Sequence, residues 1–257
     1  MNTAIGYPEK PIVIHACQVT KISSLSDNTY QIELASPEGS VLDYYAGQHL
    51  QLSLDVNGDG QLQPLLYSIA NGFDPEKPNR LQLIIQNNSE FSDKVLNRIA
   101  ALLNVEAAIP VTLPMGQAFL QTNLSQKHLL IASGSGIAKI KCLIETILRQ
   151  QPNADVNIYW SNKHADEFYL HTEFQDWLTN NQNLTFTPIL ESAHPDWSSR
   201  SGYIYEVIQQ DYDDLSDVQV YLCGSPQMVY GTIDKLAVIG LKENNCYSDA
   251  FQYAPRT

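Results

Sequence analysis

The alternation of hydrophobic and polar positions divides the chain into two parts. From residue 11 to about residue 115, apolar and polar residues alternate with a period of two, which is typical of strands with one buried face. This pattern predicts six strands, at 12–22, 29–34, 49–56, 65–70, 81–86 and 108–113. One helix is predicted over 90–103, because its apolar residues recur at helical spacing: Val95, Leu96, Ile99, Leu102 and Leu103. Many short strands with one helix predict a small antiparallel β-barrel.

The turn after the 49–56 strand has two interpretations. Asp55-Val-Asn-Gly-Asp-Gly60 reproduces the opening of an EF-hand calcium loop. The twelfth position of that loop is Leu66, where calcium needs a bidentate glutamate, and the flanking segments alternate like strands. We therefore predict a plain hairpin turn.

Beyond a loop at 117–127, the pattern changes to strands that alternate with helices. The predicted strands are 129–132, 156–160, 184–190 and 218–223, and the predicted helices are 137–150, 168–180, 203–210 and 226–239. Such alternation is typical of a doubly wound parallel sheet, in which ligands gather at the carboxyl ends of the strands. We therefore expect two domains, a β-barrel over 10–120 and an α/β domain over 121–257.

The turn after the first strand of the second part is a candidate ligand site. Leu129–Ala132 is an apolar run that suits a fully buried strand, and a helix with one apolar face follows from Ile137. Between them, Ser133-Gly-Ser-Gly136 places backbone N–H groups at the positive end of the helix dipole, where a phosphate is stabilised. Lys139 stands where the dinucleotide fingerprint has a third glycine, so the local pattern is equally compatible with a tight turn that binds nothing.

Composition narrows the classes of partner. The 15 basic and 28 acidic residues give a formal net charge of −13, which argues against nucleic acid or an anionic membrane as a partner. A phosphate would have to be held by local N–H donors, because the overall charge repels it. No apolar run is long enough to span a membrane, and the first residues lack the pattern of a signal peptide. We expect a cytoplasmic protein.

Cysteine and histidine spacing gives no indication of a metal site. The four cysteines are widely separated, and the nearest two, at 223 and 246, lie 23 positions apart. This spacing builds neither a paired zinc motif nor an iron–sulfur loop, and a disulfide framework is not expected in such a chain. His164, His171 and His194 lack zinc-protease spacing, and we interpret them as surface residues.

Six motifs, in order along residues 12–253, resemble the ferredoxin reductase superfamily. Leu66-Tyr-Ser-Ile-Ala70 resembles the flavin strand motif Arg-x-Tyr-Ser-(Leu/Ile)-Ala, and Pro114-Met-Gly-Gln-Ala-Phe119 resembles the Pro-x-Gly-x-Phe bend that closes the barrel. Ile131-Ala-Ser-Gly-Ser-Gly-Ile-Ala138 resembles the nucleotide turn Ala-Gly-Gly-Thr-Gly-Ile-Ala, and Tyr221-Leu-Cys-Gly-Ser-Pro-Gln-Met228 resembles the Cys-Gly-Pro-x-x-Met motif near the nicotinamide. Ile158-Tyr-Trp-Ser161 and Ser248-Asp-Ala-Phe-Gln-Tyr253 are similar to stand-alone bacterial NAD(P)H:flavin oxidoreductases, which reduce free flavins for other enzymes.

The resemblance implies hydride transfer from NADH or NADPH to a flavin, which could be FMN, FAD or riboflavin. It implies that Ser68 and Cys223 are catalytic, with the Ser68 hydroxyl beside the reactive flavin nitrogen and Cys223 beside the transferred hydride. The implied cofactor-binding residues are Leu66, Tyr67, Ser68, Ile69, Ala70, Gly116, Ser133, Gly134, Ser135, Gly136, Ser161, Lys163, Cys223, Gly224, Phe251 and Tyr253. Either of the two C-terminal aromatics, Phe251 or Tyr253, would shield the flavin until the nicotinamide displaces it. Hydride transfer requires no acid–base pair from the protein.

Simpler interpretations of three of these residues stay open. Tyr67 could be a buried strand aromatic, Cys223 a core cysteine and Lys163 a solvated lysine.

The chain departs from the family pattern at two places. Leu65 stands where the family usually has an arginine that grips the flavin phosphate, so we expect a looser hold on FMN or FAD. In the nucleotide turn, Ser133, Ser135 and Lys139 replace glycine, threonine and proline. Three functions follow as hypotheses: a flavin reductase that supplies a flavin-using enzyme, an electron-transfer component that retains its flavin and serves a partner protein, and a non-catalytic nucleotide-binding descendant.

Overall fold

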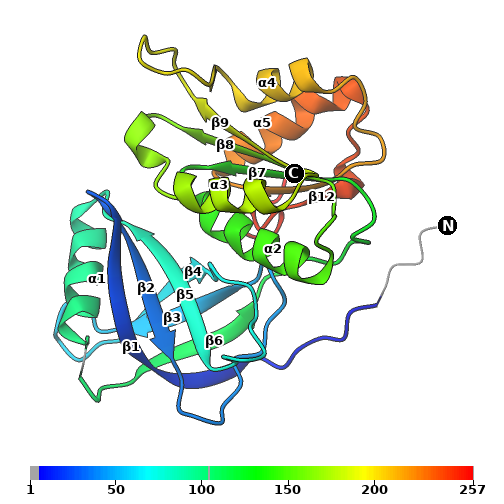
Figure 1. The fold of residues 1–257 in the computed structure, drawn as a ribbon. Helices are drawn as coiled ribbons and strands as arrows, with labels where there is room; N and C mark the ends of the chain where they lie inside the picture. Colours follow the sequence, from blue (N-terminus) through cyan, green and yellow to red (C-terminus); the bar gives the residue numbers. More distant parts are fainter. Residues whose placement is uncertain (1–5, 104, 257) are drawn as a thin grey trace. The chain divides into compact units, whose positions relative to one another are not determined.

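The computed structural model describes residues 6–103 and 105–256, which form two compact units (Figure 1). The first unit comprises the chain up to Gln121 together with Lys141–Thr146, and the second comprises Thr122–Ile140 and the chain from Ile147 onward. Each unit is built around one six-stranded sheet.

The first unit is an antiparallel half-barrel with one helix, which confirms the predicted fold class of this part. Its sheet has the order β4-β3-β6-β1-β2-β5. The strands are β1 (Val13–Ser26), β2 (Thr29–Ala35), β3 (His49–Leu54), β4 (Gln63–Ser68), β5 (Arg80–Gln86) and β6 (Ile109–Met115). The two ends of this order share no ladder among the described residues, but Ala70, just beyond β4, donates its N–H to the Gln82 carbonyl of β5 at 2.8 Å.

Period-two alternation places the apolar side chains of β3 and β4 on the core face of the half-barrel. Leu50 and Leu52 of β3 are fully buried, and the register pairs them with Tyr67 and Leu65 of β4. Leu66, which lies between Leu65 and Tyr67, therefore points to the opposite face of the sheet, and Ser68 is the last residue of the strand. The hairpin predicted at 55–60 is confirmed, because β3 and β4 pair from Leu54 and Gln63 outward.

The single helix of the first unit is α1 (Glu90–Ala101), which ends two residues before the predicted end. Ser89 caps its first turn, since the Ser89 hydroxyl accepts from the Ser92 N–H. Its buried residues are Val95, Leu96 and Ile99, which are the centre of the predicted apolar stripe.

The second unit is a parallel sheet with helices, as predicted. The sheet order is β10-β9-β8-β7-β11-β12, and every pair in it is parallel. The strands are β7 (His128–Ser133), β8 (Val156–Asn162), β9 (Leu184–Leu190), β10 (Arg200–Ser201), β11 (Gln219–Cys223) and β12 (Cys246–Tyr247). The helices are α2 (Ile137–Gln150), α3 (His171–Asn180), α4 (Ile204–Asp211), α5 (Pro226–Leu236) and α6 (Ala250–Tyr253).

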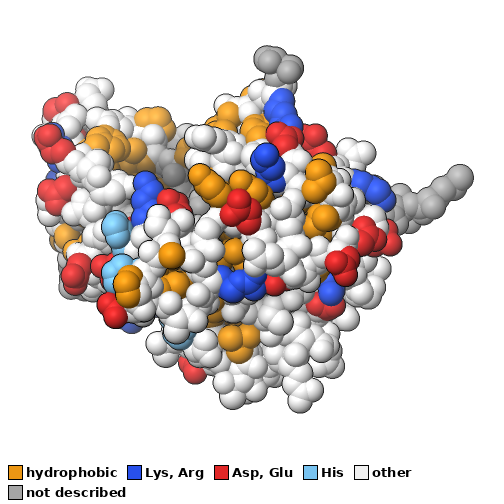
Figure 2. All heavy atoms as spheres, turned by 90° about the horizontal axis from the view of Figure 1, so that it is seen from above, with side chains coloured by type: hydrophobic (Ala, Val, Ile, Leu, Met, Phe, Trp, Pro, Cys, Tyr) orange, Lys and Arg blue, Asp and Glu red, His pale blue; other side chains and the backbone are white. Residues whose placement is uncertain are grey.

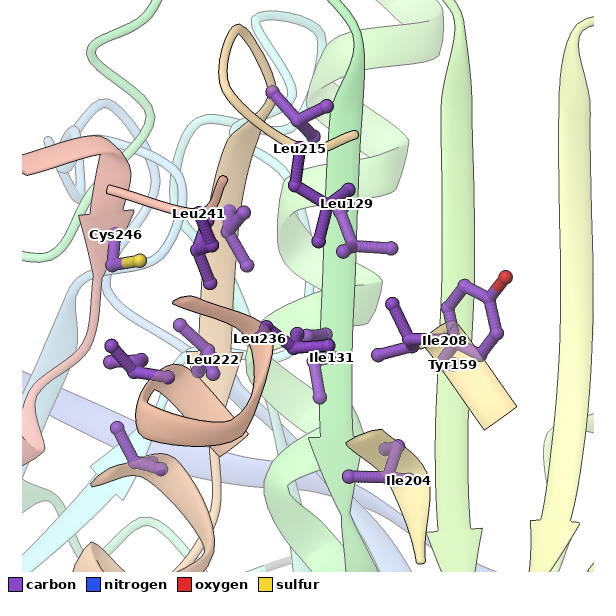
Figure 3. Close-up of a cluster of buried hydrophobic side chains, with 14 of the residues drawn as sticks. Leu129, Ile131, Tyr159, Ile204, Ile208, Leu215, Leu222, Leu236, Leu241 and Cys246 are labelled. Atoms are coloured by element: carbon purple, nitrogen blue, oxygen red, sulfur yellow. The ribbon is translucent and has the colours of Figure 1, made fainter. Parts of the chain in front are cut away.

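One hydrophobic core of the second unit lies between its sheet and helices α4 and α5 (Figure 3). Ile131 of β7 and Leu222 of β11 point from the sheet towards Ile208 of α4 and Leu236 of α5. Burial of these side chains on one face of each helix is what fixes α4 and α5 on the sheet. Helix α3 packs on the sheet through Phe174. The Phe174 ring stacks on the Phe186 ring of β9, with the ring centroids 4.6 Å apart.

Three features of the second unit differ from the prediction. The helix expected from 168 begins at His171, because Phe168 packs against the Trp160 ring instead of entering the helix. The helix expected to reach 239 ends at Leu236 and continues as a 3₁₀ turn. The short elements β10, β12 and α6 were not predicted, since two to four residues carry too little periodicity.

The surface shows mixed charge. On the face drawn in Figure 2, Lys and Arg side chains lie among Asp and Glu side chains and not in one basic patch. Within residues 6–103 and 105–256, no helix is long and apolar enough to cross a membrane. In the same residues, no three His, Cys, Asp or Glu side chains are placed to hold a metal ion.

Candidate functional site

The glycine-rich turn of the second unit joins β7 directly to α2. Strand β7 ends at Ser133, a 3₁₀ turn covers Gly134–Gly136, and α2 begins at Ile137. Gly134 has a φ of +53° and faces open space, a conformation that side chains other than glycine rarely adopt. The indole N–H of Trp160 in β8 donates to the Gly134 carbonyl at 2.9 Å, which links the turn to the neighbouring strand. The turn therefore presents the N-terminus of a 14-residue helix to a ligand.

Two strand-end turns meet at Gly136 and Cys223. Strands β7 and β11 are neighbours, and their register pairs Ala132 with Cys223. A Cβ atom on Gly136 would lie 2.3 Å from the carbonyl oxygen of Cys223, so the two backbones touch because residue 136 has no side chain. A Cβ on Gly224 would lie 2.4 Å from the Ser133 hydroxyl oxygen. The structure thus brings together Ser133, Gly136, Cys223 and Gly224 at the carboxyl edge of the sheet.

The Cys223 thiol is neutral at physiological pH. Burial raises its pKa to about 11, Lys139 opposes this rise and Asp249 adds to it. A thiol with so high a pKa is a poor nucleophile. Cys223 is also the one described cysteine that is not fully buried, since Cys17, Cys142 and Cys246 all lie in cores. Its chemistry is therefore that of a small neutral group next to the nucleotide turn.

The turn after β8 is closed by a carboxylate that the sequence did not reveal. Ser161 is buried beside Ser133 of β7, and Lys163 is exposed. The Glu167 carboxylate accepts from the N–H groups of Lys163 and His164 at 3.0 and 2.9 Å. An S/T-x-x-E type of spacing would have indicated this cap, but His164 occupies the capping position.

The two C-terminal aromatics lie in different environments. Phe251 is partly buried against the core of the second unit and packs near Tyr230 of α5, with ring centroids 5.7 Å apart. Tyr253 is 63% exposed. Burial raises the pKa of the Tyr253 hydroxyl, and the nearby Cys223 and Asp249 add to this effect. Tyr253 is therefore the more accessible of the two candidates for a shielding role.

Along the predicted flavin strand of the first unit, the side chains become more buried from Leu66 to Ala70. Leu66 is 61% exposed, Tyr67 and Ser68 are half-buried, and Ile69 and Ala70 are fully buried. Burial raises the pKa of the Tyr67 phenol, which stays protonated. The N–H groups of Ile69 and Ala70 donate to the carbonyls of Gln48 and Gln82, so these two amides are not available to a ligand.

The side chains of Tyr67 and Ser68 are available to a ligand. Neither hydroxyl makes a hydrogen bond to any residue in the described part of the chain. A half-buried hydroxyl that lacks a protein partner is a ready donor or acceptor for a bound molecule.

Gly116, at the bend after β6, is held by a buried glutamine. Its φ is +92°, and its carbonyl accepts from the Gln48 side-chain amide at 3.1 Å. The Gln48 side-chain carbonyl accepts from the Tyr45 N–H at 2.7 Å, so one side chain joins two loops. The sequence did not single out Gln48, because its role depends on a contact over 68 positions.

Comparisons with known proteins agree with this arrangement. Residues 130–233 match the family of oxidoreductase NAD-binding domains. A probable flavin reductase of Aliivibrio fischeri is 28% identical over 92% of this chain and 98% of its own length. A CDP-6-deoxy-L-threo-D-glycero-4-hexulose-3-dehydrase reductase of Yersinia pestis is 27% identical over 95% of this chain and 72% of its own length. The crystal structure of a cytochrome P450 reductase of Amycolatopsis superposes with a TM-score of 0.81, at 21% identity, over 95% of this chain and 71% of that one.

In sequence and in fold, the chain resembles the ferredoxin reductase-like family of FAD- and NAD-binding proteins. It is an oxidoreductase that uses NAD(P)H and a flavin. The family resemblance identified from six motifs is thereby confirmed.

The residues of both units fit the two cofactors of this family. In the second unit, Gly134 faces open space ahead of α2, and the Ser133 and Ser135 hydroxyls make no hydrogen bond to a described residue. These donors suit a pyrophosphate. In the first unit, the Tyr67 ring and the Ser68 hydroxyl suit an aromatic ring with polar edges. The individual roles of these residues stay predictions.

The family turn has one further feature that sequence alone did not explain. Lys139, which replaces the family proline, is only 1% exposed, and its Nζ donates to the Asp249 carboxylate at 2.8 Å. The two residues lie 110 positions apart, so nothing local indicated the pair.

Proposed function

We propose that this protein is an NAD(P)H:flavin oxidoreductase that transfers a hydride from NADH or NADPH to a flavin and releases the reduced flavin. The observation that carries the proposal is the end of β4, where Tyr67 and Ser68 keep unpaired hydroxyls beside Leu65. Leu65 is half-buried on the core face, opposite Leu52. An apolar side chain there offers no charge to a flavin phosphate, so the flavin is held by its ring and exchanges readily.

When bound, the nicotinamide and the flavin supply the hydride donor and the hydride acceptor. The protein's own part is to bind and orient. The start of α2 and the hydroxyls of Ser133 and Ser135 hold the pyrophosphate against the net charge of −13. Cys223, as a neutral thiol, adds no charge beside the nicotinamide. Ser68 donates a hydrogen bond to the flavin edge, and the Tyr67 ring packs against the flavin.

The first test is steady-state oxidation of NADH and of NADPH, followed at the nicotinamide absorbance, with riboflavin, FMN and FAD in turn. We expect turnover with free flavins, including riboflavin, which has no phosphate. A protein that oxidises neither nucleotide with any flavin would contradict the proposal.

A variant pair locates the flavin. Ser68→Ala removes one hydrogen bond to the flavin, and a bond of this kind contributes about 0.5–1.5 kcal/mol, or a two- to tenfold loss of kcat/KM. Ser53→Ala is the matched control, because Ser53 lies on the same face of the sheet but pairs with Pro64, four residues before Ser68. Equal rates for both variants and the native protein would place the flavin elsewhere.

The dehydrase reductase of Yersinia pestis supports a second candidate, a reductase component that retains its flavin and serves a partner protein. Dialysis separates the two functions. A protein that stays yellow through dialysis and reduces free flavin poorly would be a reductase component, whereas a colourless protein that turns over added flavin would be a flavin reductase.

A further inference from the structure

The lysine of the nucleotide turn sits where helix electrostatics disfavour it. Lys139 is in the first turn of α2, at the end of the helix that carries the positive dipole charge. It is also fully buried, and an unpaired buried ammonium is strongly unfavourable. The position is compatible with folding because Asp249 supplies a carboxylate at 2.8 Å, with only 20% of its side chain exposed. The pair neutralises itself, so it adds no net charge for holding a phosphate.

The partner carboxylate stands at the start of the C-terminal helix. Asp249 immediately precedes α6, and its backbone carbonyl accepts from the N–H groups of Gln252 and Tyr253 at 2.9 and 3.3 Å. The ion pair therefore connects the first turn of α2 to the turn that carries Tyr253.

The same corner of the second unit contains Cys223. Gly136, three residues before Lys139, touches the Cys223 backbone. Lys139 and Asp249 are the two charged groups that act on the Cys223 thiol, and the Tyr253 hydroxyl is the third titratable group there. Lys139 lowers the pKa of the thiol and Asp249 raises it, so the two charges act in opposite directions.

The C-terminal segment has other attachments that do not involve the ion pair. The Tyr230 hydroxyl of α5 donates to the Ala254 carbonyl at 2.8 Å, and Arg256 pairs with Asp234 at 2.6 Å. Because these contacts hold the end of the chain on α5, loss of the ion pair should alter the position of α6 without releasing it.

We propose that the Lys139–Asp249 pair is a positioning device, which fixes α6 to the nucleotide turn and sets the surroundings of Cys223 for the nicotinamide. This role rests on the proposed function, since it assumes that NAD(P)H binds at this corner. It also explains the departure from the family turn: the lysine that replaces proline has a partner in the C-terminal segment.

The test uses the rate at which a disulfide reagent modifies Cys223, measured from pH 7 to pH 10. Cys223→Ser gives the background, because the other three cysteines are buried. Lys139→Met removes the positive charge and raises the thiol pKa, so modification slows. Asp249→Asn removes the negative charge and lowers the thiol pKa, so modification accelerates. We expect changes of about three- to tenfold in opposite directions, which correspond to half to one pH unit.

If the ion pair had a purely structural role, Cys223 would be modified faster in both single variants than in the native protein, because loss of the pair would expose the thiol in either case. Shifts of the same sign would therefore overturn the proposal. The double variant Lys139→Met/Asp249→Asn should return the thiol pKa towards the native value, since it removes both charges.

The second measurement is protection of Cys223 by NADH or NADPH. In the native protein a saturating nucleotide should slow modification, and in the double variant protection should require at least fivefold more nucleotide. If a single variant does not fold, the double variant carries the test: native-like protection by nucleotide would overturn the proposal. The thiol measurements need no flavin. If the two single variants changed the rate of Cys223 modification in opposite directions but the native protein reduced no flavin, the proposed function would be refuted and this inference would stand.

Discussion

The contact between Gly136 and Cys223 predicts the effect of Gly136→Ala, and the distances in the structure give its magnitude. Gly136 has a φ of −56°, an ordinary helical value, so alanine there meets no backbone strain, only a lack of space. The new Cβ would lie 2.3 Å from the Cys223 carbonyl oxygen and 2.8 Å from the carbonyl carbon. Non-bonded atoms need roughly 3.5 Å, so the two turns must separate by about 1 Å.

We expect Gly136→Ala to destabilise the protein by about 1–3 kcal/mol, the usual cost of overpacking. The melting temperature should fall by about 2–4 °C for each kcal/mol. A displacement of about 1 Å at the nucleotide turn should also lower kcat/KM for NADH by up to about 10²-fold. Thermal unfolding and steady-state kinetics measure the two effects separately.

Gly231→Ala is the matched control, because Gly231 lies inside α5 and a Cβ there has no atom within 4 Å. It should raise stability by up to about 1 kcal/mol, since alanine is the better helix former, and leave kinetics unchanged. If Gly136→Ala kept the native melting temperature and NADH kinetics, the contact between the two turns would not matter and the reasoning would fail.

Two further predictions concern the second unit. We predict that the adenosine ribose of the nucleotide lies at the turn after β8, beside Lys163. Glu167→Gln should then raise the NADPH-to-NADH ratio of kcat/KM by about fivefold, because it removes a carboxylate whose charge would repel a 2′-phosphate there by about 1 kcal/mol; an unchanged ratio would place the adenosine ribose away from this turn. Burial holds the pKa of His128 below its ordinary value of 6.5, so the folded protein keeps this histidine neutral while the unfolded chain takes up a proton as the pH falls below 6.5. Stability should therefore decrease below pH 6.5, by at most about 1.4 kcal/mol per pH unit from this group, and His128→Gln, measured by urea unfolding at pH 5.5 and pH 7.5, should lose that part of the decrease. A variant as pH-sensitive as the native protein would contradict the assignment to His128.

The helices and strands could be predicted from the sequence because the apolar residues of a buried face recur with the period of the element. Helix α2 and strand β9 have the predicted bounds, since each presents an uninterrupted apolar face to a core. The start of α3 was predicted wrongly because a buried residue in a turn can match the spacing of a helix face. Phe168 fits the spacing of a helix face, but its ring packs against Trp160 and Trp197 from a turn.

The site was only partly predictable. The motifs indicated Ser133, Gly136, Cys223 and Gly224, and the parallel sheet brings them together at one edge, because equivalent ends of parallel strands lie side by side. The Lys139–Asp249 pair could not be predicted, since a lysine in a helix is ordinarily assigned to the solvent. Its burial depends on a carboxylate from the far end of the chain.

The hydrogen bond from Trp160 to the Gly134 carbonyl has a practical consequence. The indole is fully buried and donates to the carbonyl of Gly134, in the turn that we propose holds the pyrophosphate. Any ligand that shifts this turn changes the hydrogen bond of the indole, so the emission of Trp160 reports on occupancy of the turn. We therefore expect the emission of Trp160 to change when the nucleotide binds, and this measurement needs neither a flavin nor a second substrate.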